Sequence, residues 1–261
     1  MKWYAKLYTR IIFIFLYLPI IVLIIFSFNE SKSRAHWAGF SFHWYRELFH
    51  NELILSSLRN TLIIALASSV IALVLGTMAA LALTRYRFFG RDAVSLLIIL
   101  PISLPGVVTG IALANAFLTI FGIQLGYLTL IVSHATFCIV TIFNNAIARL
   151  RRLGGSLEEA SADLGAGTFT TFRLVTLPML RSALLAGGLL SFALSFDEII
   201  VTTFTAGQGI ETLPIWILQN LFRPNQAPVV NVVAAALIVV SVIPIWLAQR
   251  LAGTDEGVAA P

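Results

Sequence analysis

The chain has 261 residues, of which 59% are hydrophobic and only 11% are charged. Soluble domains average about 45–50% apolar and about 25% charged residues, so this chain has too few charges to cover a surface in water. A soluble enzyme and a soluble nucleic-acid-binding protein are therefore excluded. The net charge of +5 does not indicate a nucleic-acid partner, because the charges fall at the ends of apolar runs. The length suits one membrane domain over residues 1–261.

Six apolar stretches are long enough to cross a lipid bilayer, for which a helix needs about 20 mostly apolar residues. They cover about residues 11–28, 58–83, 93–121, 125–148, 182–204 and 228–248. The third stretch contains Pro101, Pro105, Gly106 and Gly110. Because proline removes a backbone donor and kinks a helix, we expect this span to be bent or broken. The sequence thus predicts an all-α membrane protein with six transmembrane helices.

The Lys and Arg residues predict the orientation of these spans. With the N-terminus in the cytoplasm, twelve of the 17 lie on the cytoplasmic side: Lys2, Lys6, Arg10, Arg85, Arg87, Arg91, Arg149, Arg151, Arg152, Arg173, Arg181 and Arg250. Lys32, Arg34, Arg46, Arg59 and Arg223 fall outside. Cytoplasmic loops of membrane proteins carry an excess of Lys and Arg, so we expect both termini in the cytoplasm.

The cytoplasmic loop between the fourth and fifth spans, residues 149–181, has a pattern typical of a structured element. It predicts a short helix over residues 157–164 and a second over about residues 168–175, which together form a helix-turn-helix elbow. Ser156 is expected to cap the first helix with Glu159 as its capping-box partner. Glycines end that helix, as is common at a helix C-terminus. The glycines are Gly165 and Gly167, and Leu177 and Pro178 follow the second helix.

This loop resembles the signature of the transmembrane subunits of bacterial ABC importers. The signature reads E-A-A, three residues, G, nine residues, and then I-x-L-P. Here Glu159, Ala160 and Ser161 are followed after three residues by Gly165, and nine residues later by Val175-Thr176-Leu177-Pro178. Ser161 and Val175 replace the usual Ala and Ile. The resemblance implies the type I permease fold, with the elbow as the coupling helix that docks in a groove of an ATP-binding subunit. The alternative is an ordinary basic cytoplasmic loop.

Further segments resemble one branch of these importers, the PotC/YdcV-like spermidine/putrescine permeases. They read LLIILPISLPGVVTGIAL, HATFCIVTIFNNAIARLRR, ALSFDEIIVTTFTAG, ETLPIWI and NVVAAALIVV. The resemblance implies a bacterial inner-membrane protein that works with two PotA-like ATP-binding subunits, a PotB-like second permease and a periplasmic PotD-like substrate-binding protein. Putrescine or spermidine is the expected substrate, and 4-aminobutyrate or another small amine or amino acid is the alternative.

No cofactor, metal site or catalytic activity is expected in the chain itself. It lacks a Walker A glycine loop with its lysine, so ATP and magnesium must be bound by partner subunits. Cys138 is the single cysteine, which excludes an internal disulfide. An intramembrane protease would need a matched nucleophile and base, an HExxH motif or two aspartates on separate spans, and the sequence offers none. A transporter driven by an ion gradient would need charges in several spans and would leave the elbow unexplained.

Two carboxylates, Asp197 and Glu198, fall near the middle of the fifth span. A charged side chain at the bilayer centre costs about 2.5–3.5 kcal/mol on insertion scales, and needs a partner or an aqueous cavity. We therefore expect Asp197 and Glu198 in the substrate path of a cationic amine, the alternative being structural bonds to neighbouring helices. His134 in the fourth span is interpreted as a buried histidine hydrogen-bonded to a neighbouring helix.

Overall fold

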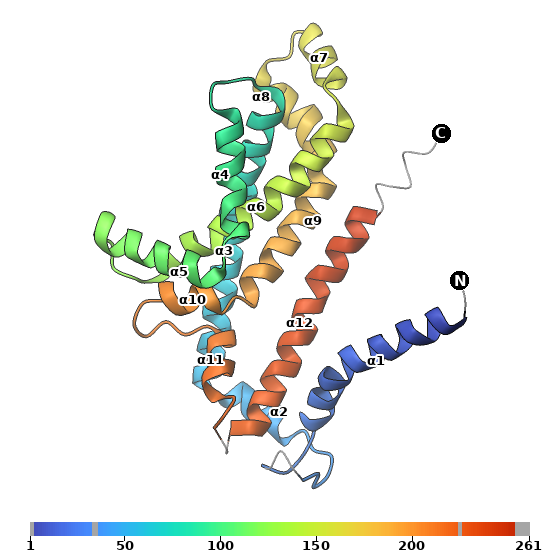
Figure 1. Ribbon diagram of the computed structural model, residues 1–261, viewed down its shortest axis with the longest axis vertical. Helices are drawn as coiled ribbons and strands as arrows, with labels where there is room; N and C mark the ends of the chain where they lie inside the picture. Colours follow the sequence, from blue (N-terminus) through green and yellow to red (C-terminus); the bar gives the residue numbers. More distant parts are fainter. Residues whose placement is uncertain (1–2, 33–35, 224–225, 254–261) are drawn as a thin grey trace. The chain divides into compact units, whose positions relative to one another are not determined.

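The computed structural model describes residues 3–32, 36–223 and 226–253, with side chains described up to residue 250. Apart from an isolated β-bridge between Asn29 and Phe40, the regular elements of these ranges are helices (Figure 1). The chain divides into two compact units. The first comprises Met1–Arg59 and Thr212–Val240, and the second comprises Asn60–Glu211 and Ser241–Pro261. The all-α class is confirmed.

Five helices are long and apolar enough to cross a membrane, and they overlap five of the six predicted spans. They are α1 (Trp3–Phe26), α3 (Glu52–Arg85), α6 (Tyr127–Leu153), the continuous helix Thr168–Phe196 and α12 (Ala227–Gly253). The helix Thr168–Phe196 is made of α8 (Thr168–Thr171), the π-helical turn η2 (Phe172–Thr176) and α9 (Leu177–Phe196). A bent pair of helices makes a sixth span if the two halves are taken together.

The bent pair coincides with the third predicted span, so the expected break is confirmed. It joins α4 (Arg91–Ser103) to α5 (Gly106–Asn115) and the π-helical turn η1 (Ala116–Ile120), with a bend of 112°. Proline cannot continue the α-helical hydrogen bonding, and Pro105 stands immediately before α5. Two glycines then let α5 pack closely on α10 (Ile200–Thr205). A Cβ on Gly110 would lie only 2.9 Å from Cδ2 of Phe204.

The fifth predicted span, residues 182–204, is wrong at both ends. The helix begins at Thr168, inside the predicted loop 149–181, and it ends at Phe196. Pro178 does not stop this helix, because it lies in the first turn of α9 directly after the π-helical turn, where an interrupted α-helical pattern is tolerated. Residues 197–199 are not helical, and the chain resumes as α10.

The core of the second unit lies between α3, α6 and α9. Its buried residues are Ala72, Ala80 and Leu83 of α3, Cys138, Ile142, Phe143, Ala146 and Leu150 of α6, and Leu180 and Leu184 of α9. Gly76 brings α3 close to α6, since a Cβ there would lie 2.8 Å from Cβ of Ile142. Small residues at such crossings are typical of membrane helices, where packing replaces the hydrophobic effect as the force between helices.

The first unit is organised around Trp44 of α2 (His43–His50). This side chain is buried, and its indole Nε1 donates a hydrogen bond to the carbonyl oxygen of Asn29 at 3.0 Å. Leu213 and Trp216 of α11 (Leu213–Asn220) pack in the same core, together with the start of α12. The aromatic-rich segment between α1 and α3 is thus folded onto apolar residues near the other end of the chain.

Gly76→Ala is expected to lower the free energy of unfolding by about 1–3 kcal/mol, the usual cost of overpacking. The added methyl group meets Ile142 at 2.8 Å and the carbonyl oxygen of Ile139 at 3.0 Å, so a helix must shift. Gly188→Ala is the matched control, because its methyl group would meet only Cδ1 of Leu73 at 3.8 Å. Thermal unfolding in detergent compares the two, and equal stability of both variants would contradict the prediction.

Candidate functional site

The elbow begins with α7 (Ser156–Asp163), whose start differs from the predicted one. Ser156 is the first helical residue and makes no capping bond. The carbonyl oxygen of Gly155 accepts hydrogen bonds from the backbone N–H groups of Glu158 and Glu159, both at 3.0 Å. The predicted capping box of Ser156 and Glu159 is therefore wrong. Gly154, at φ +63°, makes the turn that α6 needs to reach α7, so the helix starts one residue earlier than a serine cap would allow.

Gly165 ends α7 as predicted. It has φ +82°, its N–H bonds to the carbonyl of Ala162 at 2.9 Å, and the N–H of Ala166 bonds to the carbonyl of Ser161 at 3.1 Å. This pair of bonds is a Schellman motif, which closes a helix through one residue in the left-handed conformation. Gly167 does not end α7 but precedes α8.

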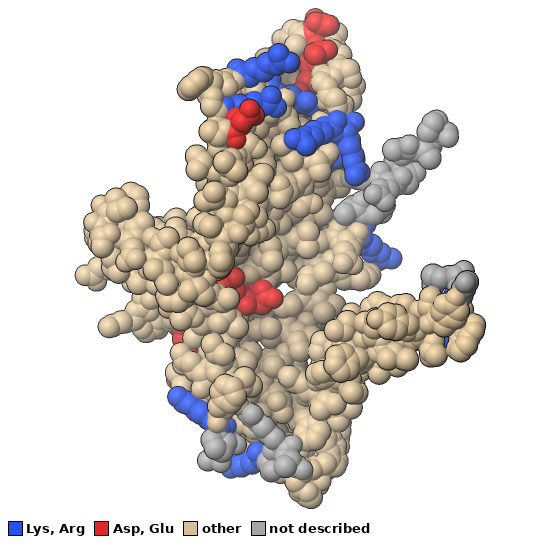
Figure 2. All heavy atoms as spheres, in the orientation of Figure 1, with Lys and Arg blue, Asp and Glu red and all other residues tan. Residues whose placement is uncertain are grey.

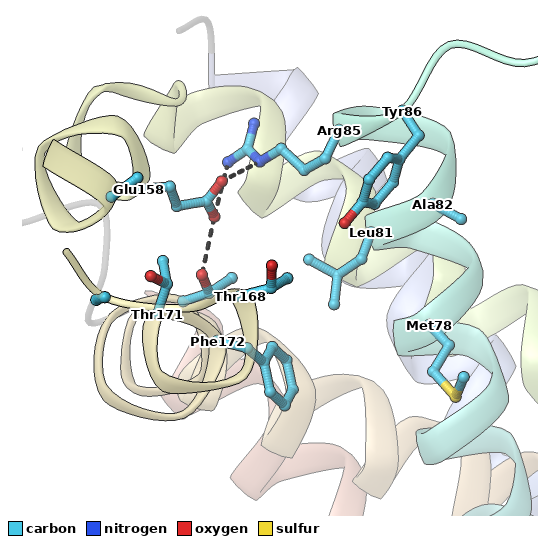
Figure 3. A pocket seen from close by; sticks show the side chains of 12 residues that line it. Met78, Leu81, Ala82, Arg85, Tyr86, Glu158, Thr168, Thr171 and Phe172 are labelled. Carbon is cyan, nitrogen blue, oxygen red and sulfur yellow. Dashed lines mark hydrogen bonds and ion pairs between the residues drawn. The ribbon is translucent and has the colours of Figure 1, made fainter.

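An ion pair that the sequence did not reveal joins the elbow to the end of α3. Nε of Arg85 lies 2.6 Å from Oε2 of Glu158 (Figure 3). Nη2 of Arg85 also donates to the carbonyl oxygen of Gly154, and the hydroxyl of Thr176 donates to Oε1 of Glu158 at 2.9 Å. We call Arg85, Glu158 and Thr176 the elbow clamp, because they join α3, α7 and η2.

A second polar contact and a pocket complete this region. The hydroxyls of Ser161 and Thr171 lie 2.9 Å apart, which links α7 to α8. A pocket of about 420 Å³ lies between the end of α3 and the elbow, with Arg85 and Glu158 among its lining residues (Figure 3). The elbow is therefore a bonded unit rather than a free loop.

The outer face of the elbow is exposed and partly apolar. Glu159 and Ala160 are exposed, as are the large side chains of Leu164 and Phe169, at 90% and 74%. Leu177 and Pro178 are also exposed, at the start of α9. Lys and Arg side chains gather at the end of the second unit that carries α7 and α8 (Figures 1 and 2).

Asp197 and Glu198 lie in the break between α9 and α10, residues 197–199, and not inside a continuous helix as predicted. Asp197 is exposed. Glu198 is half-buried, and its Oε1 accepts a hydrogen bond from the backbone N–H of Val201 at 2.8 Å. The two carboxylates therefore differ, because Glu198 bonds to the start of α10 whereas Asp197 is exposed.

His134 is buried, and both ring nitrogens are hydrogen-bonded. Nδ1 lies 2.7 Å from the hydroxyl oxygen of Ser195 on α9, and Nε2 lies 2.9 Å from that of Thr202 on α10. The interpretation of His134 as a buried residue bonded to neighbouring helices is confirmed. Within the described part of the chain, no group of three or more His, Cys, Asp or Glu side chains is arranged to hold a metal ion.

Comparison with known proteins places this architecture in a family. Residues 72–253 match the family described as the binding-protein-dependent transport system inner membrane component. The spermidine/putrescine transport system permease protein PotC of Haemophilus influenzae is 35% identical over 248 residues, which cover 95% of this chain and 92% of that protein. PotC of Escherichia coli K12 is 37% identical over 249 residues, covering 95% and 90%. The putrescine transport system permease protein PotI of E. coli K12 is 37% identical over 216 residues, covering 80% and 76%.

Solved structures share the fold at lower sequence identity. A chain of a bacterial ABC transporter that imports the acidic polysaccharide alginate is similar with a TM-score of 0.74 and 17% identity, covering 94% of both chains. A chain of the inward-facing MetNI methionine ABC transporter is similar with a TM-score of 0.63 and 19% identity, covering 76% of this chain and 94% of that one. With the match over residues 72–253, the chain belongs to the family of binding-protein-dependent transport system inner membrane components.

Proposed function

We propose that this chain is the transmembrane permease subunit of an ABC importer that carries polyamines, putrescine or spermidine, across the bacterial inner membrane. The observation that carries the proposal is its likeness, over most of its length, to permeases named for spermidine and putrescine transport. The exposed carboxylate of Asp197 suits a cationic substrate. Small amines such as 4-aminobutyrate are the alternative cargo of the same machine.

The proposed partner subunits are inferred from the missing ATP-binding motif and from the name of the family. Two PotA-like ATP-binding subunits would supply the energy and bind ATP and magnesium, since the sequence has no Walker A motif. A PotB-like permease would complete the transmembrane pathway, and a periplasmic PotD-like protein would deliver the substrate. The Lys and Arg residues at the elbow end of the second unit favour a cytoplasmic elbow and cytoplasmic termini.

The elbow would be the coupling helix. Glu159 and Ala160 offer an exposed surface to an ATP-binding subunit, while Ser161 and Gly165 hold the shape of the elbow through the Thr171 contact and the Schellman motif. A bonded unit transmits a displacement, whereas a flexible loop absorbs it. ATP binding would draw the two ATP-binding subunits together and move the elbows of the two permease subunits. This movement would open the substrate path to the periplasm, and ATP hydrolysis would return the transporter to its inward-facing state.

The continuous helix Thr168–Phe196 gives this movement a route. It starts in the elbow, contains Leu177 and Pro178, and ends directly before Asp197. If the elbow moves, this helix would move with it and would change the position of Asp197 and Glu198 in the substrate path. Glu198 would contribute mainly by capping α10, because its Oε1 is already bonded to the N–H of Val201.

Putrescine uptake by cells that lack this protein should be restored by the wild-type chain. With Glu159→Lys, uptake should fall below about a tenth of the wild-type level, because a reversed charge at a docking surface leaves the partner's charge unpaired. The control is Asp92→Lys, which makes the same charge change at an exposed position of α4 outside the elbow. Labelled putrescine measures uptake, with spermidine and 4-aminobutyrate as competitors. If 4-aminobutyrate competes and spermidine does not, the substrate is 4-aminobutyrate or a similar small amine instead of a polyamine. Full uptake with Glu159→Lys would contradict the proposed contact of Glu159 with an ATP-binding subunit.

Breaking the elbow clamp should uncouple the importer. Glu158→Gln or Arg85→Gln is expected to reduce uptake about fivefold or more while ATP hydrolysis continues, because the elbow can then move without α3. The exchange Arg85→Glu with Glu158→Arg should recover part of the uptake. Arg87→Gln is the control, since Arg87 is exposed beside the clamp. The ratio of putrescine transported to ATP hydrolysed measures the coupling, and an unchanged ratio in both single variants would refute the prediction.

A further inference from the structure

A buried chain of hydrogen bonds runs through the second unit at the α9–α10 break. It involves Ser68 of α3, His134 of α6, Ser195 of α9 and Thr202 of α10, and each of these residues is at most 3% exposed. The hydroxyl oxygens of Ser68 and Ser195 lie 3.0 Å apart, and His134 lies between Ser195 and Thr202 at 2.7 and 2.9 Å. Four helices are thus joined through side chains alone.

The number of available protons decides which group donates each of these hydrogen bonds. Thr202 has one hydroxyl proton, which it donates to the carbonyl oxygen of Glu198 at 3.0 Å. Its oxygen must then accept the bond from Nε2–H of His134. Neutral imidazole has one N–H group, so Nδ1 must accept the proton of Ser195. The hydroxyl of Ser68 lies 3.0 Å from that of Ser195 and also donates to the carbonyl oxygen of Ala65 at 3.2 Å. The bonds from Ser195 through His134 and Thr202 to the carbonyl of Glu198 therefore run in one direction, from α9 to the backbone of the break.

This direction shows what the chain of bonds holds in place. Ser195 is in the last turn of α9, and Thr202 is in the first turn of α10, so His134 bonds to both sides of the break. The carbonyl that receives the last bond is that of Glu198 itself. Helix α6 also holds the far end of α10, because the hydroxyl of Thr129 donates to the carbonyl oxygen of Thr205 at 3.0 Å.

We propose that His134 is a positioning residue for substrate passage, which fixes the α9–α10 break so that the carboxylate of Asp197 meets a small cationic amine. This inference rests on the proposed function, in which Asp197 lies in the substrate path. His134 is only 1% exposed and both of its nitrogens are bonded, so it acts through the break and not on the substrate. Without these bonds the three-residue break is free to change its angle, and the Asp197 carboxylate moves with it.

The test uses the assembled transporter in liposomes with putrescine as the substrate. His134→Leu removes both bonds, and Thr202→Val removes one hydroxyl at nearly constant volume. Thr203→Val is the matched control, because Thr203 is exposed and its hydroxyl bonds only within the local chain, to the carbonyl oxygen of Ile199. We expect KM for putrescine to rise about tenfold in the first two variants, as misplaced groups lose contact with a substrate. The control should stay within about twofold of wild type.

Hydrogen–deuterium exchange of residues 197–205 provides a readout that does not depend on transport. Exchange should accelerate in His134→Leu and in Thr202→Val, and remain unchanged in Thr203→Val. An unchanged KM together with unchanged exchange in Thr202→Val would overturn the proposal. If His134→Leu does not assemble, the results with Thr202→Val alone test the proposal. A wild-type transporter that takes up no putrescine would instead contradict the proposed function, and the exchange comparison would still show whether His134 fixes the break.

Discussion

The lipid bilayer supplies no water to hydrogen-bond a broken backbone, and this constraint governs the second unit. In the part of this unit that the structure describes, the backbone is nevertheless broken between α4 and α5 and again between α9 and α10. Both breaks occur in helices that pack on each other, because Gly106 and Gly110 of α5 lie against Ile200 and Phe204 of α10. At the second break the freed backbone groups find side-chain partners in Glu198 and Thr202. The α9–α10 break is therefore held by hydrogen bonds from its own side chains and by the packing of α10 on α5.

The elbow and the second break are two ends of one mechanical element. The helix Thr168–Phe196 runs without interruption from the elbow to Asp197, across the π-helical turn that absorbs Pro178. The elbow clamp ties its first turns to α3 through Glu158 and Arg85, and the His134 bonds tie its last turn to α6 and α10. In the proposed mechanism, a displacement of the elbow would therefore reach Asp197 and Glu198 through one continuous helix. This arrangement gives the proposed coupling a physical route.

Much of this architecture could be predicted from the sequence, because apolar length and glycine or proline positions act locally. The apolar runs predicted the membrane helices, Pro105 predicted the broken span, and Gly165 predicted the end of α7. The break after Phe196 was missed because the segment remains apolar and helical in pattern across Asp197 and Glu198. The clamp was missed because Arg85 and Glu158 are 73 residues apart, and one sequence contains no sign of such a pair. The buried state of His134 could be predicted, but its partners depend on how four helices pack.

In the proposed mechanism, ATP hydrolysis in partner subunits is coupled through the elbow and moves a polyamine along a path beside Asp197. The most direct test is putrescine uptake into liposomes that contain the purified assembly, with ATP supplied and ion gradients removed by ionophores. The account predicts uptake that requires ATP and continues without any ion gradient. Uptake that proceeds without ATP and stops when the gradients collapse would contradict it, and would make the protein a gradient-driven transporter.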